Sequence, residues 1–225
     1  MTPDPPESRT TRRARSARPR GAAGIGGSPD QIQDAYLKRA IAEIGALNDE
    51  ILGCERCGGE GTLPVMSSGS PQAQIMLVKW SASLAERQEG VAFFGRAGTA
   101  ILKSVQRLGI DPLDLYGTLC VKCRHDDPEG AADPMPSWLS REIQIVLPKL
   151  VVPMGPQALD ALNRLDFPLS EPLRAEPGAV QRFTPTIEAI YVPDIDESLD
   201  EQGAKRAFWA AFRAIGDWHE AQPPY

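Results

Sequence analysis

Four short apolar runs alternate with helical segments along this chain, and this alternation restricts the fold more than any other feature. The runs are AQIMLVKW at 73–80, LYGTLCVKC at 115–123, KLVVPMG at 149–155 and IEAIYVP at 187–193. Runs of this length and composition are typical of buried parallel strands. Helical patterns follow them at 98–109, 136–147, 156–165 and 201–218. The sequence therefore predicts an α/β fold, a three-layer sandwich with a central four-stranded parallel sheet.

The first 29 residues differ in composition from the rest of the chain. They hold six arginines, two acidic residues and many Pro, Gly and Ser residues, so their charge balance is +4. The formal charge of −6 for the whole chain leaves −10 for residues 30–225. We expect a disordered basic tail at 1–29. One domain is expected at 30–225, beginning with a helix from Ser28-Pro29 to about Ile51.

The tail has two open roles, since basic segments either contact phosphates or remain solvated. The acidic body lacks the clustered Lys and Arg of a strong DNA binder. No apolar run is long enough to cross a bilayer, and no apolar signal-peptide segment follows the amino terminus. We therefore expect a cytoplasmic protein with no membrane partner.

Between Cys54 and about Trp218, fifteen residues match a set of short motifs at the same spacing. They are Glu86, Gly90, Phe93, Gly95, Arg96, Ala97, Gly98, Thr118, Val121, Lys122, Cys123, Arg124, Pro148, Lys149 and Gly155. The motifs are C-x-x-C, G-E-A-P-G, a segment ending in P-F-V-G-R-A-G, then T-N-x-V-K-C-R-P, P-K-V-V-V-x-L-G and H-P-S. In these motifs the chain resembles the family 4 uracil-DNA glycosylases, the iron–sulfur branch of that superfamily. The resemblance implies a uracil-DNA glycosylase-like fold and a hydrolase of N-glycosidic bonds in DNA repair.

Three positions depart from the chemistry that the resemblance implies. The acid of G-E-A-P-G, which orients the attacking water, corresponds to Trp80, whose only polar atom is a donor. The asparagine that reads uracil corresponds to Leu119, which offers no donor or acceptor. The histidine of H-P-S corresponds to Val192, and losing one such donor to developing charge typically costs about two to three orders of magnitude in rate. The catalytic residues are thus degenerate at all three positions.

Other parts of the base pocket match the family. By resemblance, Phe93 stacks on the flipped base, Gly95 shapes a turn and Arg96 lies at a helix start next to it. The alternative is that Phe93 and Phe94 are core residues beside a tight turn, and that Arg96 is solvated rather than bound to phosphate. The acids near the pocket that an enzyme with substituted catalytic residues would use are Glu86, Glu89, Asp194 and Asp196.

The cysteines leave three alternatives open. Cys54-x-x-Cys57 with Cys120-x-x-Cys123 has the outward form of a four-cysteine metal site. The resemblance instead implies a [4Fe-4S] cluster on Cys54, Cys57 and Cys123, whose fourth cysteine is missing from this chain. A zinc site that uses Cys120 or His125 is the second alternative. The third is that the protein holds no metal.

These observations lead to one hypothesis and two competitors. The first is a uracil-DNA glycosylase-like protein without ordinary uracil excision, which binds single-stranded or damaged DNA weakly or serves a DNA-processing protein partner. The second is an active DNA glycosylase with substituted catalytic residues. The third is a protein-interaction scaffold that never contacts nucleic acid, which suits the −10 body.

Overall fold

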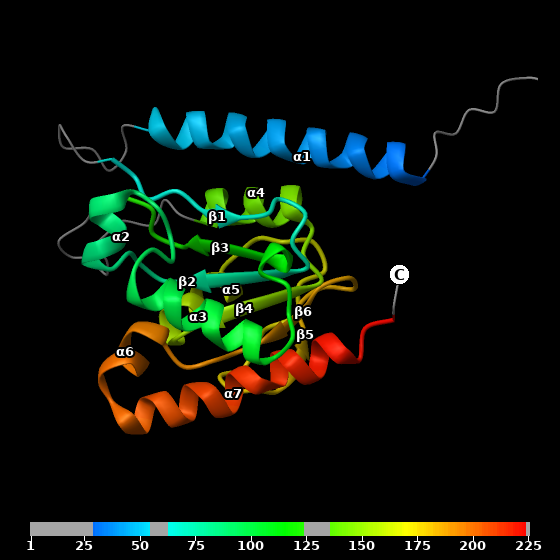
Figure 1. Ribbon diagram of the computed structural model, residues 1–225. Helices are drawn as coiled ribbons and strands as arrows, with labels where there is room; N and C mark the ends of the chain where they lie inside the picture. The colour runs from blue at the N-terminus through cyan, green and yellow to red at the C-terminus, as the bar shows by residue number, and fades with distance from the viewer. Residues whose placement is uncertain (1–28, 55–62, 124–135, 224–225) are drawn as a thin grey trace, which may run out of the picture.

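A computed structural model describes residues 29–54, 63–123 and 136–223 of the protein. One six-stranded sheet lies between layers of helices in this part of the chain (Figure 1). The strands are β1 (Ser68–Gly69), β2 (Ile75–Lys79), β3 (Leu115–Leu119), β4 (Leu150–Met154), β5 (Val180–Arg182) and β6 (Glu188–Ile190). The helices are α1 (Pro29–Leu52), α2 (Leu84–Glu89), α3 (Arg96–Arg107), α4 (Pro136–Val146), α5 (Pro156–Asn163), α6 (Ile195–Asp200), α7 (Gln202–Glu220) and the 3₁₀ turn η1 (Pro112–Asp114).

The strand order is β1-β3-β2-β4-β6-β5. The four central strands are parallel, and β2 pairs along its whole length with β3 and with β4. These are the four strands that the sequence predicts, so the α/β sandwich with a parallel centre is confirmed. β1 and β5 add an antiparallel strand at each edge, which the sequence did not predict. They are two and three residues long, too short to show an alternating pattern.

Each face of the central sheet carries its own apolar core. One core joins alternate residues of β2 to α4 and α5; its members include Met76, Val78, Leu139, Ile143 and Leu162. The other joins the remaining β2 residues to α3 and α7; it includes Ile75, Leu77, Ile101, Phe208 and Phe212. Phe208, Phe212 and Trp218 are buried there. Two cores on opposite faces make the strands apolar throughout.

α1 lies outside α4, at the outer surface of the molecule (Figure 1). One side of its last turns is buried, because Leu47 and Ile51 pack with Trp138 of α4. The predicted tail, up to residue 28, lies outside the described residues, so the proposed domain boundaries stay a prediction. Among the described helices, none is both long and apolar enough to cross a membrane.

Two six-residue helices, α2 and α6, were not predicted from the sequence. Each is held by a capping side chain rather than by an apolar pattern. Ser83 Oγ accepts a hydrogen bond from the Glu86 N–H, and Glu86 Oε2 accepts one from the Ser83 N–H. Asp194 caps α6 by accepting from the N–H groups of Asp196 and Glu197. Such caps stabilise helix starts too short to show helical periodicity.

A buried polar network fixes the end of β3 against α4. Lys122 and Glu142 are each 1% exposed, and Lys122 Nζ lies 2.9 Å from Glu142 Oε1. Lys122 also donates to Thr118 Oγ1 at 2.6 Å, and Tyr116 donates its hydroxyl to Glu142 at 3.0 Å. Burial and the Glu142 carboxylate raise the pKa of Tyr116, so this hydroxyl stays protonated. Every charge in the network has a partner of opposite charge.

Replacing one of the two charged partners of this network should lower the free energy of unfolding far more than replacing both. We expect Lys122→Met to lower the free energy of unfolding by about 3–5 kcal/mol, because it leaves the Glu142 carboxylate buried and uncompensated. The double variant Lys122→Met/Glu142→Leu should recover much of that loss. Urea denaturation followed by circular dichroism measures both. Equal losses in the single and double variants would contradict this account.

Candidate functional site

A cleft of about 550 Å³ opens where the parallel strands end. Its lining includes residues of α2, α3 and α6, helices that lie at this end of the sheet (Figure 1). The carboxyl ends of parallel strands are where α/β sheets bind ligands. The lining residues are Trp80, Ser81, Ala82, Ser83, Leu84, Ala85, Phe94, Arg96, Ala97, Gln157, Asp194, Asp196, Glu197, Leu199 and Asp200.

A buried lysine occupies the inner end of this region. Lys79, the last residue of β2, is 1% exposed. Its Nζ donates to both carboxylate oxygens of Glu86, at 2.8 and 3.1 Å, and lies 2.6 Å from Asp196 Oδ2. Glu86 is itself fully buried and also accepts the N–H groups of Ser83 and Phe93. The lysine thereby joins β2 to α2 and to α6.

Phe93 is half-buried, and its ring contacts both Gly117 of β3 and the side chain of Lys79. Its backbone has a φ of 59°, and a Cβ on Gly117 would come within 2.5 Å of its ring. The Lys79 Nζ lies 5.5 Å from the ring centroid. Gly98 is required next to it, since a Cβ there would overlap the Phe93 carbonyl oxygen. The ring therefore packs on β3 and faces the buried ammonium.

Gly95 and Phe94 complete this turn on its outer side. Gly95 has a φ of 82°, a conformation that favours glycine. Phe94 is 46% exposed and lines the cleft. The two aromatic residues of the turn thus differ: Phe93 packs inward, whereas Phe94 does not belong to the core.

Leu119 lies at the end of β3 and is fully buried. It packs in a small apolar cluster with Val65 and Ala92, against which Ala82 and Phe93 also pack. Val192 is fully buried as well, in the core beneath α3 and α7. Neither side chain lines the cleft. Trp80 does line it, and within the described residues its Nε1 is buried without a hydrogen-bond partner.

The cleft wall formed by α6 is strongly acidic. The carboxylates of Asp194, Asp196, Glu197 and Asp200 line the cleft, and Arg96 is the one basic residue among the lining side chains. Arg96 pairs with Asp200 at 2.8 Å, and its guanidinium donates to the Leu199 carbonyl. Burial raises the pKa of Asp196, although Lys79 acts in the opposite direction.

The four acids singled out from the sequence fall in different places. Asp194 and Asp196 line the cleft, as expected of acids near a pocket. Glu86 is buried and its oxygens already accept four hydrogen bonds from Lys79, Ser83 and Phe93. Glu89 is exposed on α2 and is not among the lining residues. Glu86 thus holds the turn together rather than facing the cleft.

The cysteines separate into two environments. Cys54 follows α1 and packs beside the cluster that contains Val121; like Cys123, it is half-buried. Cys120 belongs to the core on the other side, is 1% exposed, and burial raises its pKa to about 12. The sequence candidates Cys57 and His125 lie outside the described residues. Within the described ranges, no group of three His, Cys, Asp or Glu side chains is arranged to hold a metal ion.

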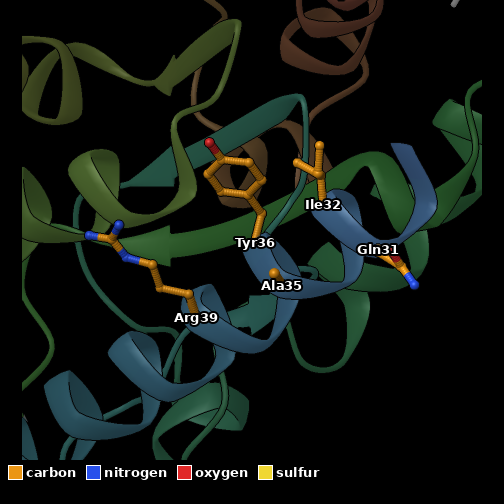
Figure 2. A pocket seen from close by; sticks show the side chains of 5 residues that line it. All are labelled: Gln31, Ile32, Ala35, Tyr36 and Arg39. Carbon is orange, nitrogen blue, oxygen red and sulfur yellow. The ribbon is translucent and has the colours of Figure 1, made fainter. Parts of the chain in front are cut away.

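A different hollow, of about 350 Å³, lies on the first turns of α1. Figure 2 shows its side chains, Gln31, Ile32, Ala35, Tyr36 and Arg39, with Ile32 and Tyr36 projecting one turn apart on the same side of the helix. Arg39 pairs with Glu43 of the same helix at 2.7 Å. This hollow brings together no group suited to acid–base or nucleophilic chemistry.

Comparison with known proteins assigns the scaffold that carries the cleft. The family model described as "Uracil DNA glycosylase superfamily" matches residues 66–208, which include the cleft and the buried lysine. The chain belongs to the uracil-DNA glycosylase superfamily. A curated relative, the type-4 uracil-DNA glycosylase of Sulfurisphaera tokodaii, is 30% identical over 116 residues, 48% of this chain and 53% of that protein. The chain therefore spans about half the length of this relative, and the resemblance to family 4 is confirmed.

Within this superfamily member, Lys79 is the residue of the candidate site that sequence reasoning missed. The resemblance drew attention to Trp80, the next residue, because the family's acid corresponds to that position. The available signal was a lysine at the end of a strand that is otherwise apolar, seven residues before a glutamate. A charge in a buried strand requires a partner, and Glu86 supplies it.

The two carboxylates around Lys79 should contribute unequally to stability. We expect Lys79→Met to lower the free energy of unfolding by about 3–5 kcal/mol, because Glu86 is left charged and buried. Asp196→Asn should cost about 1 kcal/mol or less, since Asp196 is 38% exposed and Lys79 keeps Glu86. Urea denaturation of the two variants compares them. A larger loss in Asp196→Asn than in Lys79→Met would contradict the assignment.

Proposed function

We propose that this superfamily member does not excise uracil and acts as an accessory protein in DNA processing. The observation that carries the proposal is the position of Lys79. By resemblance, a flipped uracil stacks on Phe93, but the ring already packs on Gly117 and faces the Lys79 ammonium. A base could enter only if the ion pairs of Lys79 were broken, which leaves charges buried and uncompensated.

The replaced catalytic positions support the same proposal. Leu119 is packed with apolar neighbours where the family reads uracil, so it cannot reject other bases by hydrogen bonding. Val192 is in the core and cannot stabilise charge on a leaving base. Trp80 reaches the cleft but its indole N–H cannot accept a proton from water. Each step of uracil excision thus lacks a suitable side chain.

The acidic cleft favours a protein partner over DNA. Four carboxylates on the α6 wall repel phosphates at the place where a flipped nucleotide would enter. Residues 30–225 carry −10 in total, which opposes non-specific DNA binding as well. We infer that single-stranded or damaged DNA binds weakly at most, and that the chain works through a DNA-processing protein.

We expect no uracil excision by the full chain. The measurement uses excess protein, purified without air, on single-stranded and duplex oligonucleotides that carry one uracil, with alkali-induced strand breaks as the readout. A uracil-DNA glycosylase run in parallel is the positive control. Breaks that require the wild-type chain and disappear in Asp194→Asn or Asp196→Asn would overturn the proposal in favour of an enzyme with substituted catalytic residues.

For the cysteines, we infer an iron–sulfur site on Cys54, Cys57 and Cys123. The half-buried Cys54 and Cys123 are accessible to a cluster, whereas the buried Cys120 packs in a different core. Coordination requires a thiolate, which the buried environment of Cys120 disfavours. Such a cluster would hold the end of α1 near the segment that follows β3.

We expect iron and acid-labile sulfide in protein purified without air, with the brown colour of a cluster. Cys123→Ala should lose the iron, whereas the matched variant Cys120→Ala should keep it. Metal analysis and the visible absorption spectrum give the readout. Zinc that is lost in Cys120→Ala would instead support the alternative site that uses Cys120, and colourless, metal-free wild-type protein would refute both sites.

A further inference from the structure

We propose that the cleft binds the arginine-rich segment of this chain at residues 9–20, RTTRRARSARPR. The inference rests on the proposed function only in that no uracil substrate uses the cleft. It concerns a peptide ligand, and it can fail while the absence of uracil excision holds. The cleft has an acidic wall and an apolar, aromatic wall, and together they select arginine rather than a base or a phosphate.

The first wall consists of the carboxylates on α6. Asp194, Asp196, Glu197 and Asp200 face a cleft whose lining contains one basic residue, Arg96. Asp196 is paired with Lys79, which it shares with the buried Glu86, and Asp200 is paired with Arg96. Two cations thus face five carboxylates, so the wall keeps a net negative charge. Guanidinium groups pair with carboxylates through two parallel hydrogen bonds, which an ammonium cannot form.

The second wall is apolar and aromatic. Leu84 and Phe94 are 62% and 46% exposed, and Trp80 lies deeper in the same cleft. Arginine stacks its planar group on aromatic rings while its methylene stem covers apolar surface. A phosphate ligand gains nothing from this apolar wall, and the carboxylates of the acidic wall repel it. The combination therefore matches a peptide that presents several arginines.

The chain can deliver this segment to its own cleft. α1 begins at Pro29 and has 24 residues, so it is about 36 Å long. Its carboxyl end lies on the side of α2, whose Leu84 and Ala85 line the cleft, and its amino end lies on the opposite side (Figure 1). To reach the cleft, an arginine must lie farther from Pro29 than the length of α1. The four arginines at 9–15 meet this condition, because the 14 to 20 residues that join them to Pro29 reach up to about 46 to 66 Å when extended. Arg18 and Arg20 reach about 36 Å at most, so the four arginines at 9–15 are the ones that enter the cleft. The +4 balance of residues 1–29 complements the −10 of the body.

The test measures binding of a fluorescein-labelled peptide of residues 7–22 by anisotropy in low-salt buffer. The acceptor is the full chain with its six arginines at 9–20 changed to glutamine, so that its own segment does not compete. We expect the peptide to bind this acceptor with an affinity that falls as the salt concentration rises. We expect it to bind the wild-type chain less tightly. Glu197→Gln/Asp200→Asn in the acceptor should weaken binding roughly five- to thirtyfold.

The matched control is Asp217→Asn/Glu220→Gln, which removes the same charge from the exposed end of α7. It should change the affinity less than twofold. Equal weakening by both variants would reduce the effect to general charge attraction and overturn the site. No binding at low salt overturns it as well. A third outcome also overturns it: a single-stranded oligonucleotide binds the wild-type chain but not the chain with glutamines at the six arginine positions, and Glu197→Gln/Asp200→Asn does not change its affinity. The cleft would then not compete with DNA for the arginines.

Discussion

One buried ammonium organises the functional end of this molecule. Lys79 ends a strand that is buried on both faces, and a charge in that place is stable only with compensating carboxylates. Glu86 and Asp196 provide them from α2 and α6. The turn that positions Phe93 depends on the same contact, because Glu86 also accepts the Phe93 N–H. The short helices and the turn therefore form one unit around the lysine.

The scaffold of the superfamily is retained although the interior of its pocket has changed. The second charged network, around Lys122 and Glu142, lies at the end of β3 and fixes α4. Both networks are built partly from residues that match the family, among them Lys122 and Glu86. Lys79 itself, however, stands at the first glycine of the family's G-E-A-P-G motif. A parallel sheet with two separate cores tolerates such replacement at strand ends, because the cores do not depend on it. A chain can thus keep the fold of its superfamily while the residues of its site differ.

The rim of the cleft combines acidic side chains with exposed apolar ones. A site for DNA needs positive potential where phosphates lie, but the α6 wall carries four carboxylates. The exposed Leu84 and Phe94 beside them add apolar area that single-stranded DNA would meet only through its bases. A cationic peptide satisfies both walls at once. The rim therefore supports the proposed ligand, a cationic segment of protein.

Sequence alone determined the central strands, the main helices and the family, because buried strands and amphipathic helices are encoded in local periodicity and the matching motifs have fixed spacing. It also led to the prediction that the family's catalytic residues are replaced at Trp80, Leu119 and Val192. The sequence did not predict the edge strands or the helices α2 and α6, since these elements are short and depend on caps and pairing partners. Only the tertiary structure placed Asp196 beside Lys79, 117 positions earlier in the chain. It alone also separated Cys120 from Cys54, because contacts between distant segments are decided by packing rather than by local pattern.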